Sequence, residues 1–219
     1  QLASELDQYN KERQLLEKDL LQSILNTTKF HFNDPVLILS GSNWHEGIIG
    51  IVAARLKDKF NKPVIIISKD GGIGKASARS IVGFDIGAVI IAATQENILL
   101  KGGGHKMAGG FSIKVENIEK LRDFVFNKFK NVNMDLTAER PLLLDSIISP
   151  SAVNLEFYNK IATLSPFGSG NPEPKFIIEN VKIINGKIVG EKHVKSVLIG
   201  NDGSTIKCIA FNAVENDIG

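Results

Sequence analysis

The densest group of residues able to do chemistry is the glycine-rich segment 101–110, Lys-Gly-Gly-Gly-His-Lys-Met-Ala-Gly-Gly. Consecutive glycines let main-chain N–H groups approach a ligand without interference from a Cβ atom, and such nests bind anions. A histidine in such a loop can donate a hydrogen bond to an oxyanion. A flexible turn between a helix and a strand is the alternative interpretation. The segment predicts an anion-binding loop built from Lys101, Gly102, Gly103, Gly104, His105 and Lys106.

A second group lies in the predicted strand 74–80, where Lys75, Ser77 and Arg79 alternate with small residues. Side chains alternate between the two faces of a strand, so these three point to one face. Two cations and a hydroxyl between alanines suit a phosphate backbone, and the guanidinium of an arginine can bind a phosphate through two hydrogen bonds. The alternative is a solvent-exposed strand face without a ligand.

A third group, residues 42–47, reads Ser-Asn-Trp-His-Glu-Gly and begins a predicted helix. Free N–H groups at a helix N-terminus attract anions. Trp44 and His45 equally well fix the corner between strand and helix. The sequence leaves both interpretations open.

Several kinds of site are absent from the sequence. It contains no Asp-His-His or His-x-Asp grouping of the kind that holds divalent ions for phosphodiester hydrolysis. Cys208 is the only cysteine, which excludes a disulfide within the chain and fits a reducing cytoplasm. No apolar run reaches the roughly 18 residues that a membrane span needs. We therefore expect a cytoplasmic chain with no metal site or cofactor of its own and no membrane partner.

The net charge of +2 is unevenly distributed along the chain. Residues 36–133 carry 14 basic and 8 acidic side chains, whereas the segments on either side are each slightly acidic. An excess of positive charge in the middle segment is expected of a surface that meets phosphates. Chance asymmetry on an ordinary solvated surface is the alternative.

Apolar periodicity predicts a helix over residues 2–25 and then an α/β domain over residues 36–132. Buried strands at 36–39 and 64–67 flank a helix at 46–60, which is the pattern of a parallel strand-helix-strand unit. The domain should hold about five mostly buried strands with flanking helices. Its other predicted elements are strands near 74–80 and 110–115 and helices at 85–97 and 118–129.

The pattern of predicted elements changes after a bridge at residues 133–170, in which a helix is expected around 151–164. Asn185-Gly186 and Asn201-Asp202-Gly203 favour tight hairpin turns. A partial antiparallel β domain is therefore predicted, one strand short of the five in an oligonucleotide-binding barrel. Its expected strands are 176–184, 187–189, 194–199 and 205–211.

Three motifs occur in the order found in a known family. They are residues 44–55, which read Trp-His-Glu-Gly-Ile-Ile-Gly-Ile-Val-Ala-Ala-Arg, the Ser-Ala-Arg-Ser of 77–80, and Gly-Gly-His at 103–105 with Ala-Gly-Gly at 108–110. Together with the Pro-Phe-Gly-Ser-Gly-Asn-Pro of 166–172, they make the chain resemble the RecJ family of single-strand-specific DNA exonucleases in the DHH phosphoesterase superfamily. The resemblance implies a connector helix over 1–35, a DHH-associated domain over 36–132, a helical bridge over 133–170 and a partial oligonucleotide-binding (OB) domain over 171–219.

The resemblance also implies a division of labour. Manganese or magnesium in the intact enzyme would be held by a DHH domain outside this sequence, so the chain alone is expected to bind DNA without cutting it. Arg79 and Ser80 would grip phosphates near the 5′ end, and His105 would stabilise charge that develops at the scissile phosphate. The intact enzyme would act in DNA repair and recombination, with single-stranded DNA as its ligand and a single-strand-binding protein or a helicase as a further partner.

Two other functions stay open. A DHH-type phosphodiesterase for short oligoribonucleotides or cyclic dinucleotides shares the glycine–histidine segment, but normally lacks the β domain. A non-catalytic RNA-binding module, like the associated domain of alanyl-tRNA synthetases, is the other candidate, and the motif at 166–172 argues against it.

Overall fold

The structure, a computed structural model, describes residues 2–26, 34–132, 142–168 and 170–214. The chain divides into two compact units, Gln1–Ala138 and Glu139–Gly219, which we call the α/β unit and the β unit.

The α/β unit contains a five-stranded sheet with the strand order β1-β2-β3-β5-β4. Strands β1 and β2 are parallel, as the strand-helix-strand pattern predicts, and the other neighbours are antiparallel. The predicted α/β class with about five strands is confirmed. The elements are α1 (Leu2–Asn26), β1 (Leu37–Ser42), α2 (Glu46–Phe60), β2 (Val64–Asp70), β3 (Ile73–Arg79), α3 (Ile86–Gln95), β4 (Lys101–His105), β5 (Ala108–Lys114), a 3₁₀ turn (Val115–Asn117) and α4 (Ile118–Lys130).

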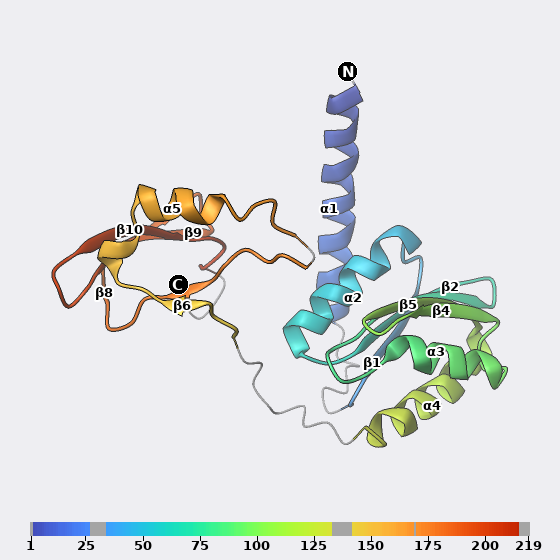
Figure 1. The fold of residues 1–219 in the computed structure, drawn as a ribbon. Helices are drawn as coiled ribbons and strands as arrows, with labels where there is room; N and C mark the ends of the chain where they lie inside the picture. Colours follow the sequence, from blue (N-terminus) through green and yellow to red (C-terminus); the bar gives the residue numbers. More distant parts are fainter. Residues whose placement is uncertain (1, 27–33, 133–141, 169, 215–219) are drawn as a thin grey trace. The chain divides into compact units, whose positions relative to one another are not determined.

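Helices lie on both faces of this sheet, with α2 on one side and α3 and α4 on the other (Figure 1). The interior strand β2 begins with four buried apolar residues, Val64 to Ile67, whose side chains alternate between the two helical layers. Burial on both faces explains why this strand reads as a continuous apolar run. The sheet is therefore a rigid support for any site on its remaining open surface.

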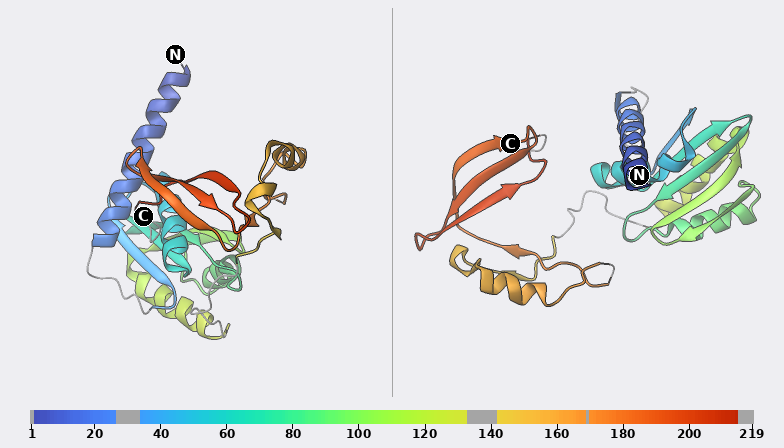
Figure 2. Two further views of the ribbon diagram at one scale, coloured as in Figure 1. Left: turned by 90° about the vertical axis from the view of Figure 1, so that its left-hand side faces the viewer. Right: turned by 90° about the horizontal axis from the view of Figure 1, so that it is seen from above.

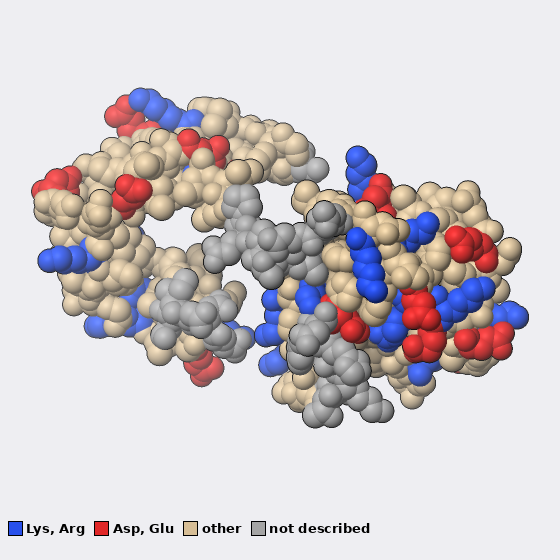
Figure 3. All heavy atoms as spheres, turned by 90° about the horizontal axis from the view of Figure 1, so that it is seen from below, with Lys and Arg blue, Asp and Glu red and all other residues tan. Residues whose placement is uncertain are grey.

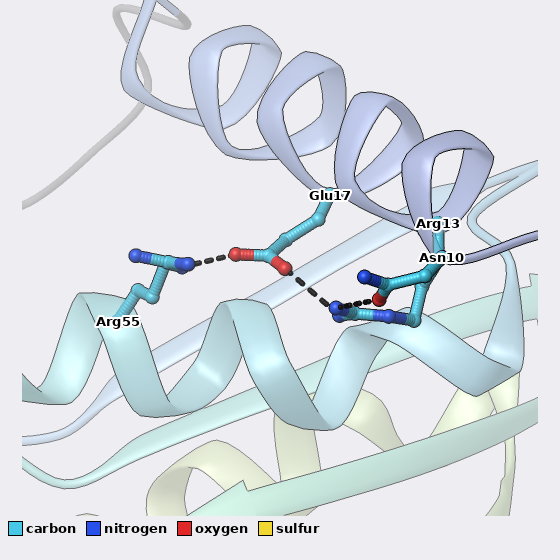
Figure 4. Close-up of polar contacts among 4 residues, drawn as sticks. All are labelled: Asn10, Arg13, Glu17 and Arg55. Atoms are coloured by element: carbon cyan, nitrogen blue, oxygen red, sulfur yellow. Dashed lines mark hydrogen bonds and ion pairs between the residues drawn. The ribbon is translucent and has the colours of Figure 1, made fainter. Parts of the chain in front are cut away.

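Helix α1 packs on α2 through Leu20 and Ile24, which are buried. Beside them lies Glu17, only 4% exposed, whose carboxylate contacts Arg55 of α2 and, at 3.2 Å, Arg13 of its own helix (Figure 4). Burial of a carboxylate without a partner is costly, so the two arginines make this position tolerable. The contact fixes where α1 lies on α2.

The β unit holds a three-stranded antiparallel sheet in the order β10-β9-β8, whose strands are seen from two directions in Figure 2. Near the start of the unit, the side-chain amide of Asn171 donates to the carbonyls of Leu164 and Pro166, at 2.9 and 3.0 Å. Residues 133–141 and 169 of the predicted bridge and motif lie outside the described residues. The elements are β6 (Ser146–Ile147), a 3₁₀ turn (Pro150–Ala152), α5 (Leu155–Ala162), β7 (Phe176–Ile177), β8 (Lys182–Val189), β9 (His193–Ile199) and β10 (Thr205–Ala210).

The structure corrects three local predictions. Strand β1 does not end before Ser40 but continues to Ser42, in register with β2. Asn185-Gly186 is not a hairpin turn, because β8 runs through it with an irregularity in register between Ile184 and Lys187. A left-handed asparagine followed by glycine suits such a bulge as well as it suits a turn. The glycine-rich segment is not a loop, because residues 101–105 form β4, an edge strand of the sheet.

Candidate nucleic-acid interface

Three neighbouring strands, β3, β5 and β4, present a surface of nine side-chain positions, which we call the floor. Residues paired across antiparallel strands point to the same face of a sheet. Helix α2 lies on this face against β2 and β3, with Val64 and Ile66 buried beneath it, and leaves the part of the floor on β5 and β4 uncovered. The nine positions are Lys75, Ser77 and Arg79 on β3, Ser112, Gly110 and Ala108 on β5, and Lys101, Gly103 and His105 on β4.

The register places the basic groups of the floor in two rows. Lys75 and Lys101 pair with the same residue of β5, Ser112, and so lie in one row. Arg79 and His105 both pair with Ala108 and form the row at the other end. The centre holds the small residues Ser77, Gly110 and Gly103.

A groove of about 570 Å³ runs over the Lys75 end of this floor, and its α2 side is formed by Glu46 and Ile49. Phosphates along an extended strand carry a repeating negative charge, which such a surface can follow without steric obstruction from large side chains.

Arg79 is held along the floor by its own strand. Its Nη1 atom donates to the Oγ of Ser77 at 3.1 Å and to the carbonyl of Ala78 at 2.8 Å. Because Ser77 accepts this bond, its own hydroxyl proton stays available for donation to an anion. The predicted grouping of Lys75, Ser77 and Arg79 on one strand face is thus what the structure shows, with Ala76 and Ala78 buried on the other.

Gly50 of α2 is a part of the site that the sequence argument missed. A Cβ atom at this position would lie 2.9 Å from Nη2 of Arg79 and 3.0 Å from the Oγ of Ser77. The glycine therefore lets α2 approach β3 closely enough to flank the guanidinium. A glycine inside a helix costs roughly 1 kcal/mol of stability relative to alanine. A glycine in the middle of the predicted helix 46–60 therefore indicates a close packing contact, and this was the signal in the sequence for Gly50.

Ser80 does not belong to the floor, which corrects the expectation that it grips a phosphate. It is 1% exposed, and its hydroxyl donates to the carbonyl of Phe84 at 2.6 Å. Its N–H group donates to the carbonyl of Met107 at 2.9 Å. As the residue that follows Arg79 on the strand, it points to the opposite face and stabilises the turn after β3.

The glycines of β4 serve close packing in an extended strand, so the predicted anion-binding nest is not formed. A nest needs residues of alternating helical handedness, and none of these glycines has a positive φ. A Cβ atom on Gly102 would lie 2.7 Å from Ile90 of α3, and one on Gly104 would overlap the carbonyl oxygen of Ala108. Only Gly103 faces open space, toward the groove.

His105 ends β4 beside an anchored hairpin tip. Its side chain is exposed, and its Nδ1 atom lies 3.4 Å from the N–H nitrogen of Met107. The carbonyls of Lys106 and Met107 accept hydrogen bonds from the N–H groups of Ile86 and Ser80, at 3.3 and 2.9 Å. The tip is therefore fixed to the loop after β3, with the side chain of Lys106 exposed.

Trp44 and His45 lie at the corner between β1 and α2, outside the floor. The Nδ1 atom of His45 accepts a hydrogen bond of 3.0 Å from the N–H of Gly47, which makes this histidine the N-cap of α2. The ring of Trp44 packs over Gly41 and its carbonyl accepts from Ser68. These contacts support the structural interpretation of both residues.

The remaining surface offers less. Helix α4 carries Lys120, Lys128 and Lys130 together with Glu119 and Asp123. Basic and acidic side chains are interspersed on the face of the α/β unit that Figure 3 shows. Within the described ranges, no group of three or more His, Cys, Asp or Glu side chains could hold a metal ion. No helix among those residues is long and apolar enough to span a membrane.

Comparisons with known proteins agree with this architecture. The family model of the DHHA1 domain matches residues 33–131, and that of the RecJ OB domain matches residues 144–218. The chain is 31% identical to the single-stranded-DNA-specific exonuclease RecJ of Bacillus subtilis and 34% identical to that of Haemophilus influenzae, over 98% and 97% of its length. These matches cover 28% and 39% of the relatives, so the chain spans well under half of their length.

Among solved structures, the crystal structure of RecJ from Thermus thermophilus in complex with Mg2+ matches 96% of this chain with a TM-score of 0.72 and 25% identity. The match covers 32% of that protein. Fold and site thus define a DHHA1-type α/β domain with a basic floor, followed by a β domain of the OB type. The chain belongs to the RecJ family, of which it contains these two domains.

Proposed function

We propose that this chain is the strand-binding part of a nuclease that degrades single-stranded DNA from its 5′ end, and that the floor grips the sugar-phosphate backbone. The observation that carries the proposal is the register, which places Lys75, Lys101, Arg79 and His105 at the corners of a surface of small side chains. The names of the relatives, which are single-stranded-DNA-specific exonucleases, support the choice of ligand.

Within the floor, we assign ground-state binding to Arg79, Ser77 and the lysines, and a transition-state role to His105. Arg79 and Ser77 form one preorganised phosphate site, because they are hydrogen-bonded to each other. His105 stands at the strand end with an exposed imidazole, suited to meet charge that develops on a reacting phosphate. Lys106 at the adjacent tip adds positive charge. In the intact enzyme, removal of one such transition-state donor typically costs about 10² to 10³ in rate.

Metal chemistry is assigned elsewhere in the intact protein. Related RecJ structures hold Mg2+ or Mn2+, and the described residues of this chain offer no fitting cluster of ligands. We therefore infer that manganese or magnesium does not bind here, and that the chain alone binds strands without cutting them. Roles in DNA repair and recombination, a cytoplasmic location and contact with a single-strand-binding protein or helicase belong to the same proposal.

The test is a fluorescence-anisotropy titration of the purified chain with a long labelled single strand at several salt concentrations. Arg79→Ala should weaken binding by about 1–3 kcal/mol, because a charge-assisted contact is lost. It should also reduce the slope of log affinity against log salt by about 0.7, because one fewer phosphate is neutralised. His105→Ala should change affinity much less than Arg79→Ala.

Lys120→Ala on the exposed side of α4 is the matched control, since it removes one positive charge far from the floor and should leave both quantities unchanged. Equal effects of Arg79→Ala and Lys120→Ala would contradict the assignment of the floor. Tighter binding of a dinucleotide than of the long strand would favour a small-substrate phosphodiesterase, and preference for tRNA would favour an RNA-binding module. Cutting of end-labelled DNA by the chain with manganese would contradict its proposed inactivity.

A further inference from the structure

Glu46 places a negative charge in a groove that the proposed function assigns to an anion. It is the first residue of α2 and the only acidic residue among the described residues that line the groove. Its carboxylate contacts the Nζ atom of Lys75 at 2.8 Å. A bound phosphate would have to compete with this carboxylate for the lysine.

Glu46 is not needed to cap its helix, since the N-cap is His45 and its imidazole already accepts the N–H of Gly47. An acidic residue in the first turn does interact favourably with the helix dipole, which is the plain structural explanation of its presence. That explanation does not account for its contact with Lys75, because the dipole acts on Glu46 whether or not a lysine is near.

The ion pair between Glu46 and Lys75 is weak enough for a phosphate to displace it. Both side chains are more than half exposed, 58% for Lys75 and 51% for Glu46, and exposed ion pairs are weak. A phosphate that enters the groove can therefore displace the carboxylate without disrupting the fold. The lysine is left with an equivalent partner, and Glu46 turns to solvent.

The opposite row of the floor carries no such competitor. Arg79 is held by neutral groups only, the hydroxyl of Ser77 and the carbonyl of Ala78. Among the described residues, no carboxylate lies within ion-pair distance of Arg79 or of Lys101. Among the described residues, the Arg79 row thus keeps its arginine available, whereas the other row holds one neutralised lysine, Lys75, and one without a carboxylate partner, Lys101.

We propose that Glu46 is a built-in competitor of the DNA backbone, which occupies Lys75 when no strand is bound and yields it when a phosphate arrives. The inference rests on the proposed function. Phosphates would then bind tightly beside Arg79 and exchange readily beside Lys75. A DNA strand can be released from Lys75 while it is still held at Arg79.

The experiment is a double-mutant cycle with Glu46→Gln and Lys75→Ala, measured as affinity for single-stranded DNA at several salt concentrations. Glu46→Gln should tighten binding about two- to fivefold, the scale of an exposed ion pair, and should steepen the salt dependence. In the Lys75→Ala background the same substitution should tighten binding much less. Glu119→Gln is the control, because it removes a carboxylate that pairs with Arg122 on α4 and changes the net charge equally.

Weaker or unchanged binding by Glu46→Gln would overturn the proposal and leave Glu46 as a helix-terminal residue. An equal gain with and without Lys75, or an equal gain in Glu119→Gln, would reduce the effect to net charge and would also overturn it. If Lys75→Ala and Arg79→Ala both leave affinity unchanged, the proposed function itself fails. The two failures are therefore distinguishable in one data set.

Discussion

The α/β unit and the β unit bury their side chains to different extents. In the α/β unit, two clusters of buried apolar residues occupy both faces of the sheet, and only the floor is left open. In the described part of the β unit, only Pro150, Ser196, Gly200 and Ala213 are buried, and every residue of β8 is exposed. A binding surface on the first unit is therefore held by a packed core, whereas a surface on the second depends mainly on main-chain pairing.

The two units also place their positive charges differently. Three strands of the β unit carry four lysines, and their register puts all of them on one face of the sheet. Lys187 and Lys195 are paired across β8 and β9, whereas aliphatic residues stand opposite Lys182 and Lys207, and His193 lies on the same face with Val189 as its partner. We expect the β unit to add general electrostatic attraction for a DNA strand and the α/β unit to fix the position of that DNA strand. The four lysines are Lys182, Lys187, Lys195 and Lys207.

The contrast in burial between the two units predicts that the same truncation, isoleucine to alanine, has very different costs in stability in the two units. Ile67→Ala removes a side chain that is 0% exposed in the α/β core and should cost about 2–5 kcal/mol. Ile183→Ala on β8 removes one that is 67% exposed and should cost no more than about 0.5 kcal/mol. Trp44 is the only tryptophan, so urea unfolding followed by its fluorescence reports the α/β unit.

Hydrogen exchange in β8 and β9 reports the other unit for Ile183→Ala. Similar costs for the two truncations would show that the β unit has a core of its own, and the contrast between the units would be withdrawn.

Two adjacent glycines of β4 sharpen the comparison within the α/β unit. Gly104→Ala should lower stability by about 1–3 kcal/mol, because its Cβ atom would overlap the main chain of β5. Gly103→Ala should be neutral or slightly stabilising, since nothing lies within 4 Å of its Cβ position. Trp44 fluorescence in urea measures both.

Gly103→Leu then separates stability from binding, because it fills the floor without touching the core. Its unfolding midpoint should match that of the unmodified chain, while its affinity for single-stranded DNA should fall. Undiminished affinity would mean that the DNA strand binds somewhere other than the floor.

The smallest expected effect concerns the turn between β9 and β10. The hydroxyl of Ser204, together with its N–H group and with Ser151, holds the pKa of Asp202 below its ordinary value of 3.8. Since the folded-state pKa is the lower one, the contribution to stability is fully present above the unfolded value and is lost as the pH falls through the folded-state pKa. An NMR titration of the Ser204 amide should show a midpoint below 3.8.

Ser204→Ala is the control for that titration, followed at the amide of residue 204, and it should move the midpoint back toward the ordinary value. A midpoint at or above 3.8 in the unmodified chain would contradict the role of the turn.

Much of the fold could be predicted because its determinants are local. Helix α2 begins at Glu46 and ends at Phe60 as its apolar spacing predicts, and the alternation along β3 places Lys75, Ser77 and Arg79 on one face. Consecutive glycines show no such periodicity and favour a loop at 101–105, where the structure has a strand.

The sequence by itself determined the elements, the family motifs and the face on which the cations of β3 lie, because side-chain periodicity is a property of one segment. Only the tertiary structure decided that β5 lies between β3 and β4, which brings Arg79 and His105 into one row. It also decided that Ser80 is buried, that Gly50 flanks the guanidinium of Arg79, and that Glu46 reaches Lys75. These outcomes depend on tertiary contacts that no single segment specifies; the packing of α2 against β3, for example, brings Gly50 to Arg79 and Glu46 to Lys75.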